Sequence, residues 1–336
     1  MTQALPPIEL QAPDISRWRD AQAGHSSGVD HVHVLQAAAP GRSVLVQALT
    51  HGNEICGAIA LDWLLQQVAA GWRPLRGRLV LAFANTAAYA RFDPADPFAS
   101  RCVDEDLNRV WGDEALDSAR DSVELRRARA LRPFVDAADW LLDLHSMGEP
   151  GRPLMVCGRV AKNAALALQL GVPETLLLDT GHPAGLRMIE RGGSGDPESA
   201  KRALLIECGQ HWERAAADVA IDTLVRFLGL AGLAAPDWVA AHVRVTPPAV
   251  QRLVRVSMPV VARSADFRFL VPIVNLGVVR HAGTPIAQDG EQVWRAPHDD
   301  TVLVMPGLHN LKPGGTAVRL GRFEPLDTLG AAQDAA

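Results

Sequence analysis

The pattern of apolar residues near the start of the chain predicts two buried strands joined by a helix. Residues 43–49 (SVLVQAL) and 79–84 (LVLAFA) are short, mostly apolar runs of the length expected for buried strands. Between them, residues 54–70 carry apolar side chains near helical spacing, and Gly71 follows as a stop signal. A strand–helix–strand unit of this kind favours an α/β fold with parallel strands in one sheet.

The same alternation of helices and strands continues further along the chain. Such elements are predicted over 121–138 (helix), 139–144, 153–157, 203–206 (strands) and 214–231 (helix). Two long polar stretches, 91–106 and 180–201, interrupt this pattern. Loops of this length in a folded domain are usually functional or mobile.

The character of the chain changes after about residue 240. Short runs rich in β-formers, such as RVSMPVVA and FLVPIVNLGVV, alternate with turn sequences such as QDGE, PHDD and KPGG. Regular short strands with such turns predict a small β-barrel or β-sandwich. We therefore predict a catalytic domain over residues 1–240 and a C-terminal β-domain over residues 241–336.

Composition and charge exclude several classes of partner. The net charge of -5 and the absence of a long basic block argue against a nucleic-acid-binding protein. The most apolar late helix contains Asp222 and Arg226, so we expect no membrane span. The four cysteines lack CxxC spacing, and the N-terminus lacks a signal-peptide pattern. These features predict a cytoplasmic protein with reduced thiols, and they leave a homo-oligomer open.

A compact group of polar residues follows the first predicted strand in the motif HGNE. His51 and Glu54 lie where a strand ends and a helix begins, and ligands of open α/β sheets bind at such carboxyl ends. His145, in the sequence DLH, follows another predicted strand and completes a His2Glu set that is typical of catalytic zinc sites. Asp143 could accept the spare imidazole N–H of a ligand. The alternative is a polar turn in which Asn53 caps the helix.

Glu207 is the best candidate for a general base. It follows the predicted strand 203–206, so it should reach the same edge of the sheet. Hydrolysis of an amide requires a group that takes a proton from water and gives it to the leaving nitrogen. His211, four residues later, is a weaker candidate for the same role.

The polar stretch before residue 110 supplies cations for an anionic substrate. Arg101 and Arg109 offer guanidinium groups that bind carboxylates bidentately, and Asn108 adjoins the second of them. The alternative is a set of structural ion pairs with the neighbouring acids Asp104, Glu105 and Asp106. We expect Asp106 to orient one of the arginines.

Together, four motifs in this order resemble the succinylglutamate desuccinylase/aspartoacylase family of zinc carboxypeptidase-like hydrolases. The motifs are HGNE, R-x6-NR, DLH and the late IE. The resemblance implies a three-layer α/β domain with a mixed, largely parallel sheet, and a C-terminal β-domain that caps the active site. It also implies one Zn²⁺ per chain and a deacylase that hydrolyses the amide bond of a small N-acyl amino acid or N-acylated amine by metal-activated water.

The resemblance also assigns roles to residues. His51, Glu54 and His145 bind zinc, Asn108 and Arg109 hold the substrate carboxylate, Arg101 polarises the scissile carbonyl, and Glu207 activates water. Family members place a tyrosine of the C-terminal domain in the substrate pocket, whereas the single tyrosine of this chain is Tyr89. The alternatives are a zinc carboxypeptidase that acts on peptides and a non-catalytic binding module.

Overall fold

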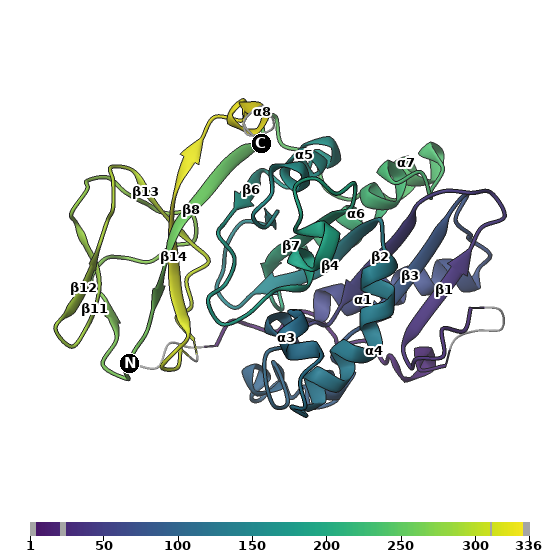
Figure 1. Ribbon diagram of the computed structural model, residues 1–336, viewed down its shortest axis with the longest axis horizontal. Helices are drawn as coiled ribbons and strands as arrows, with labels where there is room; N and C mark the ends of the chain where they lie inside the picture. The colour runs from purple at the N-terminus through teal and green to yellow at the C-terminus, as the bar shows by residue number, and fades with distance from the viewer. Residues whose placement is uncertain (1–4, 21–24, 310, 332–336) are drawn as a thin grey trace.

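The computed structural model describes residues 5–20, 25–309 and 311–331, which form an α/β structure extended by a β-rich C-terminal region (Figure 1). The strands are β1 (Val32–Gln36), β2 (Ser43–Ala48), β3 (Arg78–Phe83), β4 (Trp140–Met147), β5 (Leu154–Val156), β6 (Thr175–Leu178), β7 (Arg202–Gln210), β8 (Arg252–Val261), β9 (Arg268–Phe269), β10 (Val278–Val279), β11 (Pro285–Asp289), β12 (Gln292–Arg295), β13 (Thr301–Val304) and β14 (Thr316–Glu324). The α-helices are α1 (Ile55–Ala69), α2 (Thr86–Tyr89), α3 (Asp113–Leu116), α4 (Val123–Ala137), α5 (Ala161–Leu170), α6 (Arg214–Leu230), α7 (Pro236–His242) and α8 (Thr328–Ala331). The 3-10 helices are η1 (Ser16–Trp18), η2 (Pro97–Ser100), η3 (Leu107–Arg109), η4 (Met188–Glu190) and η5 (Gly192–Ser194).

One long sheet organises the molecule. Within the described residues its strand order is β1-β3-β2-β4-β7-β5-β6-β8-β14-β13-β10. Strands β3, β2, β4 and β7 run parallel. Strand β1 pairs antiparallel with β3, and β5 pairs antiparallel with β7 but parallel with β6. The carboxyl ends of β2, β4 and β7 therefore share one edge, which is where such sheets bind ligands. The predicted mixed, largely parallel sheet is confirmed.

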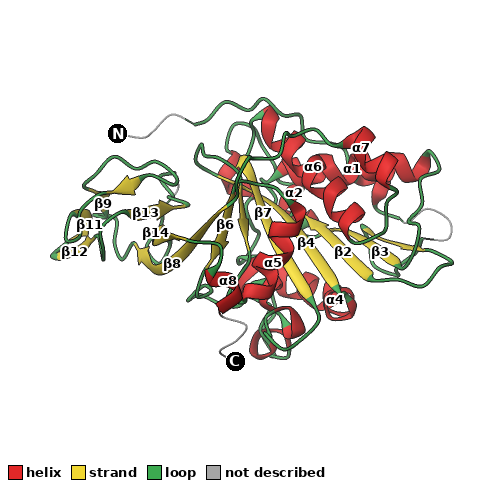
Figure 2. Ribbon diagram, turned by 90° about the horizontal axis from the view of Figure 1, so that it is seen from above, coloured by secondary structure: helices red, strands yellow, loops and turns green. Residues whose placement is uncertain are grey.

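Helices cover both faces of this sheet. Helices α1, α5 and α6 bury apolar side chains such as Leu61, Ala167 and Phe227 on one face, which we call the helical face (Figure 2). Helix α4 covers the other face together with the segments around η3 and η4, which contribute Leu107 and Met188 to a separate core. We call this second face the loop-covered face.

The C-terminal region begins as a continuation of the long sheet. Strand β8 pairs in parallel with β6, and β14, β13 and β10 follow it. A second, antiparallel sheet of β12, β11 and β9 packs against these strands through a small core that contains Ile286, Trp294, Leu303 and Leu320. The predicted C-terminal β-domain is confirmed as a small antiparallel sheet packed on the end of the long one. The division at residue 240 stays a prediction.

Most of the predicted elements lie close to their observed bounds, but several elements were missed, among them β1, β6 and α5. Strand β1 was not predicted because its sequence, VHVLQ, mixes polar and apolar residues at a sheet edge. Strand β6 has four residues, too few to show a period. Helix α5 has an alanine-rich sequence and lacks a side-chain cap.

In the described residues, no helix is long and apolar enough to cross a membrane.

Glu124 in the first turn of α4 anchors the segment that precedes η3. Its buried carboxylate accepts hydrogen bonds from the backbone N–H groups of Val103 (2.6 Å), Asp104 (3.0 Å) and Glu105 (3.2 Å). The side chain of Asn85 donates a fourth bond at 2.9 Å. Burial opposes ionisation, but these donors lower the pKa of Glu124 below its ordinary value.

We predict that Glu124→Gln lowers the free energy of unfolding by about 1–3 kcal/mol, because an amide NH2 would face donors that need an acceptor. Because the native pKa of Glu124 is lowered, its contribution is present above the unfolded pKa of about 4.3 and is lost as pH falls further. Urea denaturation at pH 7 and pH 3 measures both effects. Glu114→Gln, an exposed change in α3, is the control. Equal stability of the two variants at pH 7 would contradict the anchoring role.

Candidate active site

Two neighbouring parallel strands present the central polar residues on the same face. Along β4, Asp143 and His145 alternate with the apolar Leu142 and Leu144, which belong to the core of the helical face. Glu207 occupies the equivalent position on β7, and His145 and Glu207 are direct partners in the strand register. Strand pairing therefore places a candidate ligand next to the candidate base, on the loop-covered face.

The HGNE motif forms a tight turn between β2 and α1. The turn begins at Leu49, whose φ of 59° is left-handed. A Cβ atom at Gly52 would lie 2.4 Å from the backbone of both Ala88 and Ser100, so the close approach requires glycine. Helix α1 begins after Glu54, which is its N-cap residue but makes no side-chain capping bond.

Three buried side chains converge at this turn. Nδ1 of His51 lies 2.7 Å from one oxygen of Glu54, and Nδ1 of His145 lies 2.9 Å from the other. Candidate ligand atoms of the three residues all lie within 4.8 Å of one another. Two imidazoles and a carboxylate are a donor set that suits a divalent transition metal such as Zn²⁺. The alternative of a turn capped by Asn53 is wrong, because the N-cap residue of α1 is Glu54 and the side chain of Asn53 has no hydrogen-bond partner among the described residues.

Each candidate histidine ligand has a second carboxylate on its other nitrogen. Nε2 of His145 lies 2.8 Å from Asp143, which also accepts a 2.9 Å bond from the Thr50 hydroxyl. Nε2 of His51 lies 2.9 Å from Asp106. An Nε2–H bonded to a carboxylate leaves the Nδ1 lone pair for a metal. Burial opposes protonation, but Asp143 and Glu54 hold the pKa of His145 well above its ordinary value.

Arg101 lies directly beside the candidate ligands. Its guanidinium donates to Asp106 at 3.1 Å and lies 3.6 Å from Glu54. It also lies 2.9 Å from Nε2 of His51. The ion pair with Asp106 that we considered as an alternative is therefore present, and it holds Arg101 at the metal site. The side chain of Arg101 is 40% exposed, so it remains accessible to a bound molecule.

The NR pair lies in η3 and is fixed by the second polar stretch. The side-chain carbonyl of Asn108 accepts a 3.0 Å bond from the backbone N–H of Met188, so this oxygen is engaged within the protein. Arg109 donates to the carbonyl oxygen of Asn108 at 2.7 Å. Its guanidinium lies 3.9 Å from Asp106, and burial lowers the pKa of Arg109 to about 10. Among the described residues, this cation therefore has a single carboxylate partner, and that partner is distant.

Glu207 is buried, and its Oε2 atom has no hydrogen-bond partner among the described residues. Burial raises the pKa of Glu207 to about 8, although the charges of His145 and Arg101 oppose the shift. A carboxyl group with such a pKa exchanges protons near neutral pH, as a general acid–base catalyst requires.

His211 is less suited to that role. Its Nδ1 atom lies 2.9 Å from the Ser146 hydroxyl, and its ring contacts those of Phe98 and Trp212. Burial lowers the pKa of His211 to about 3, so it stays neutral and lines the region.

The C-terminal region contributes residues that the sequence pattern did not reveal. His309 stacks on Phe98 and lies 2.7 Å from Glu149 with 9% of its side chain exposed. Arg319 on β14 is also close enough to affect the charge of Arg109 and Glu207. No local signal identifies either residue, because both reach the site through strand pairing and domain packing. Tyr89 lies elsewhere and donates to the carbonyl oxygen of Pro13.

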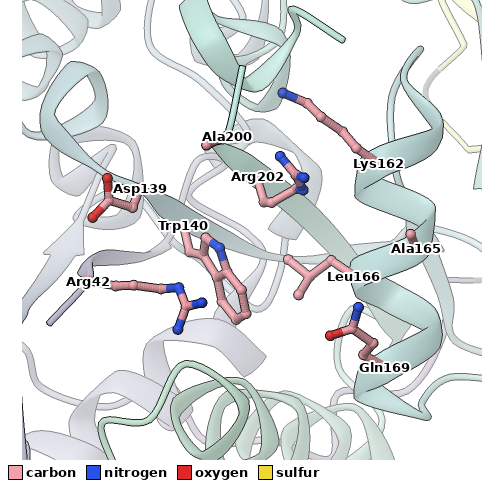
Figure 3. A pocket seen from close by; sticks show the side chains of 9 residues that line it. All are labelled: Arg42, Asp139, Trp140, Lys162, Ala165, Leu166, Gln169, Ala200 and Arg202. Carbon is pink, nitrogen blue, oxygen red and sulfur yellow. The ribbon is translucent and has the colours of Figure 1, made fainter. Parts of the chain in front are cut away.

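A cavity of about 520 Å³ lies at the amino ends of β4 and β7, at the edge opposite the histidines (Figure 3). Arg42, Trp140 and Arg202 line it together with the carboxylate of Asp139. The described residues that line it include no histidine, so the cavity does not match the metal-ligand pattern. Lys162, at its rim, donates to three backbone carbonyl groups and fixes the adjacent loop.

Comparison with known proteins agrees with the geometry. Residues 40–228 match the model of the succinylglutamate desuccinylase/aspartoacylase catalytic domain. A succinylglutamate desuccinylase of Burkholderia cenocepacia is 28% identical over 82% of this chain and 80% of its own length. A probable aspartoacylase of Parasynechococcus marenigrum is 37% identical over 39% of this chain and 44% of its own length.

Solved structures show the same fold. The succinylglutamate desuccinylase of Chromobacterium violaceum superposes with a TM-score of 0.62 at 21% identity, covering 88% of this chain and 89% of that one. Murine aminoacylase 3 gives a TM-score of 0.58 at 22% identity, covering 86% and 97%. The chain therefore belongs to the succinylglutamate desuccinylase/aspartoacylase family, as its motifs predicted, and with it to the hydrolases of linear carbon–nitrogen amide bonds.

Proposed function

We propose that the protein is a zinc-dependent deacylase that hydrolyses the amide bond of a small N-acyl amino acid or N-acylated amine. The observation that carries this proposal is the buried set of His51, Glu54 and His145 with Glu207 beside it in strand register. Relatives named succinylglutamate desuccinylase and probable aspartoacylase support a small acylated substrate.

The ligand set fits one Zn²⁺ per chain. Nδ1 of His51, Nδ1 of His145 and the carboxylate of Glu54 would hold the ion, while Asp106 and Asp143 fix the orientation of the two rings. A bound Zn²⁺ would polarise the substrate carbonyl and acidify water. Three protein ligands leave a position open, as catalytic zinc sites require.

The protein's own residues carry the proton and orient the substrate. Glu207 would take a proton from the attacking water and deliver it to the departing nitrogen, for which a raised pKa is suited. Arg101 would stabilise negative charge that develops on the carbonyl oxygen. Arg109, positioned by Asn108, would bind a substrate carboxylate, because its present carboxylate partner is 3.9 Å away.

The C-terminal domain over residues 241–336 would cap the site and limit it to small substrates. Two contacts support this arrangement: Asn275 lies 3.4 Å from the sulfur of Met147, and His309 pairs with Glu149. A cap disfavours the alternative of a carboxypeptidase acting on long peptides. The complete ligand set and the base disfavour a non-catalytic binding module. We further propose a cytoplasmic location, because the described cysteines are free.

We predict that Glu207→Gln lowers kcat/KM by roughly 10²–10⁴-fold, because the amide cannot accept the proton. A panel of N-acetyl, N-succinyl and N-aspartyl amides, with short peptides included, measures amine release by the zinc-loaded protein. Glu198→Gln, an exposed change, is the control, and zinc content is measured in both variants. Retained turnover in Glu207→Gln would exclude this residue as the base.

His145→Ala should lose its metal, because two remaining ligands cannot form the site. Asp143→Asn should weaken zinc affinity by about 10–100-fold, because it removes the acceptor that orients His145. Elemental analysis after dialysis against a competing chelator measures both, with the exposed His281→Ala as the control. A full zinc complement in His145→Ala would show that the ion binds elsewhere.

The activity should depend on pH through Glu207. Its pKa is raised to about 8 from an ordinary 4.5, and a nearby bound cation lowers it from that value. Because the base must be ionised, kcat/KM should fall as pH decreases through an acidic limb between these two values. Profiles of the wild type and Glu207→Asp test this, and the limb should move in the variant. A limb that stays in place would assign it to another group.

A further inference from the structure

The cavity of about 520 Å³ at the amino ends of β4 and β7 lies away from the candidate metal ligands (Figure 3). Trp140 and Arg202, which both line it, are direct partners in the strand register. His145 and Glu207 are partners near the opposite ends of the same two strands. Five positions separate the two pairs along each strand, which is about 16 Å at the rise of a β-strand.

The cavity also lies on the other face of the sheet. Trp140 packs against the core of the helical face, to which Leu142 belongs. Leu204, two residues after Arg202, belongs to the same core, so Arg202 points to that face as well. Glu207 is an odd number of residues further along β7 and therefore points to the loop-covered face. The sheet itself thus separates a ligand in the cavity from the candidate base.

The lining of the cavity is positively charged. Arg42, Lys162 and Arg202 line it, and within the described residues none of the three forms an ion pair with a carboxylate. The carboxylate of Asp139 instead accepts a 2.8 Å bond from the backbone N–H of Ser43. Burial lowers the pKa of Arg202, and burial together with the charge of Arg202 lowers the pKa of Lys162 to about 8. An anion in the cavity would stabilise these cations.

Several hydrogen-bond donors of the lining are available to a ligand. Nη1 of Arg202 donates to two backbone carbonyl groups at 2.9 and 3.1 Å, and Nη1 of Arg42 donates to one at 3.5 Å. Among the described residues, the Nε and Nη2 groups of both arginines and the indole N–H of Trp140 have no acceptor. Lys162 donates to three backbone carbonyl groups, so it contributes charge without a free donor.

An apolar surface adjoins these donors. The guanidinium of Arg42 lies 4.5 Å from the centre of the Trp140 ring, and Figure 3 shows this ring between Arg42 and Leu166. Leu166 lies one turn after Lys162 on α5, so this helix forms the facing wall. The volume is within the range of small-molecule sites and far exceeds that of a single oxyanion. The cavity therefore suits a flat apolar group joined to an oxyanion.

We infer that this cavity is a second binding site, which takes a small organic anion with a phosphate or carboxylate group joined to a flat apolar part. The guanidinium groups of Arg42 and Arg202 supply the donors for the oxyanion, because their planar forks match both kinds of group. Trp140 and Leu166 contact the flat part. The inference does not rest on the proposed deacylase activity, since the cavity lies at the other edge and on the other face of the sheet.

Calorimetric titration of the full chain tests the site with two charged probes, adenosine 5′-monophosphate and 2-naphthoate. Adenosine and 2-naphthamide are their neutral counterparts, and inorganic phosphate and acetate are oxyanions without a ring. At least one charged probe should bind about tenfold more tightly than its neutral counterpart and than its oxyanion alone, because charge-assisted bonds and ring contacts both contribute. A preference for the nucleotide would assign a phosphate ligand, and a preference for 2-naphthoate a carboxylate.

Variants locate the bound probe. Arg202→Met should weaken its binding by about tenfold, because charge-assisted bonds are lost. Ala165→Phe should block binding without removing a charge, because Ala165 lines the cavity. Arg322→Met, which changes an exposed arginine of β14, is the control, and Arg109→Met removes a cation of the candidate active site. Both should bind the probe as the wild type does, and thermal denaturation checks the fold of every variant.

Three results would overturn the inference. The first is binding that is lost in Arg109→Met but retained in Arg202→Met and Ala165→Phe, because that pattern places the anion at the candidate active site. The second is equal affinity for the charged probes and their neutral counterparts or lone oxyanions. The third is the absence of binding of either charged probe at millimolar concentration. If Arg202→Met fails to fold, Ala165→Phe decides the outcome.

Discussion

The parallel register of β2, β4 and β7 is the constraint on which the site depends. Backbone pairing sets His145 next to Glu207, and the turn after β2 brings His51 and Glu54 to the same place. Because side chains alternate along a strand, a shift of one residue in β7 would turn Glu207 into the opposite core. Backbone pairing between the strands therefore determines which side chains lie together at the site.

The charged side chains around the candidate metal site differ in how well their charges are compensated. Asp143 and Asp106 orient the candidate ligands, and Asp106 also holds Arg101. Arg109 lies 3.9 Å from Asp106. Burial lowers the pKa of Arg319, whereas the charges of Asp179 and Glu207 oppose this shift. Buried positive charge is unfavourable unless carboxylates compensate it. The site thus combines a candidate metal-ligand set with several arginines.

The loops owe their shape to a few buried polar contacts. The carboxylate of Glu124 accepts hydrogen bonds from the backbone of the segment that precedes η3. The side chain of Asn108, in η3, accepts a hydrogen bond from the backbone of Met188 in the second polar stretch. Such contacts hold irregular backbone in place because they satisfy N–H groups that no strand or helix would pair. They also explain how long polar stretches can hold candidate catalytic groups in defined positions.

The sequence alone determined the α/β architecture, the ligand candidates and the family, because apolar runs and short motifs report strands and the residues that follow them. It predicted that Asp106 would orient one of the arginines, and the structure shows Asp106 in contact with Arg101 and also with His51. Only the tertiary structure brought Arg319 near residues more than 100 positions away. Strand pairing between distant segments leaves no local pattern, so residues that reach a site in this way are visible only in the folded chain.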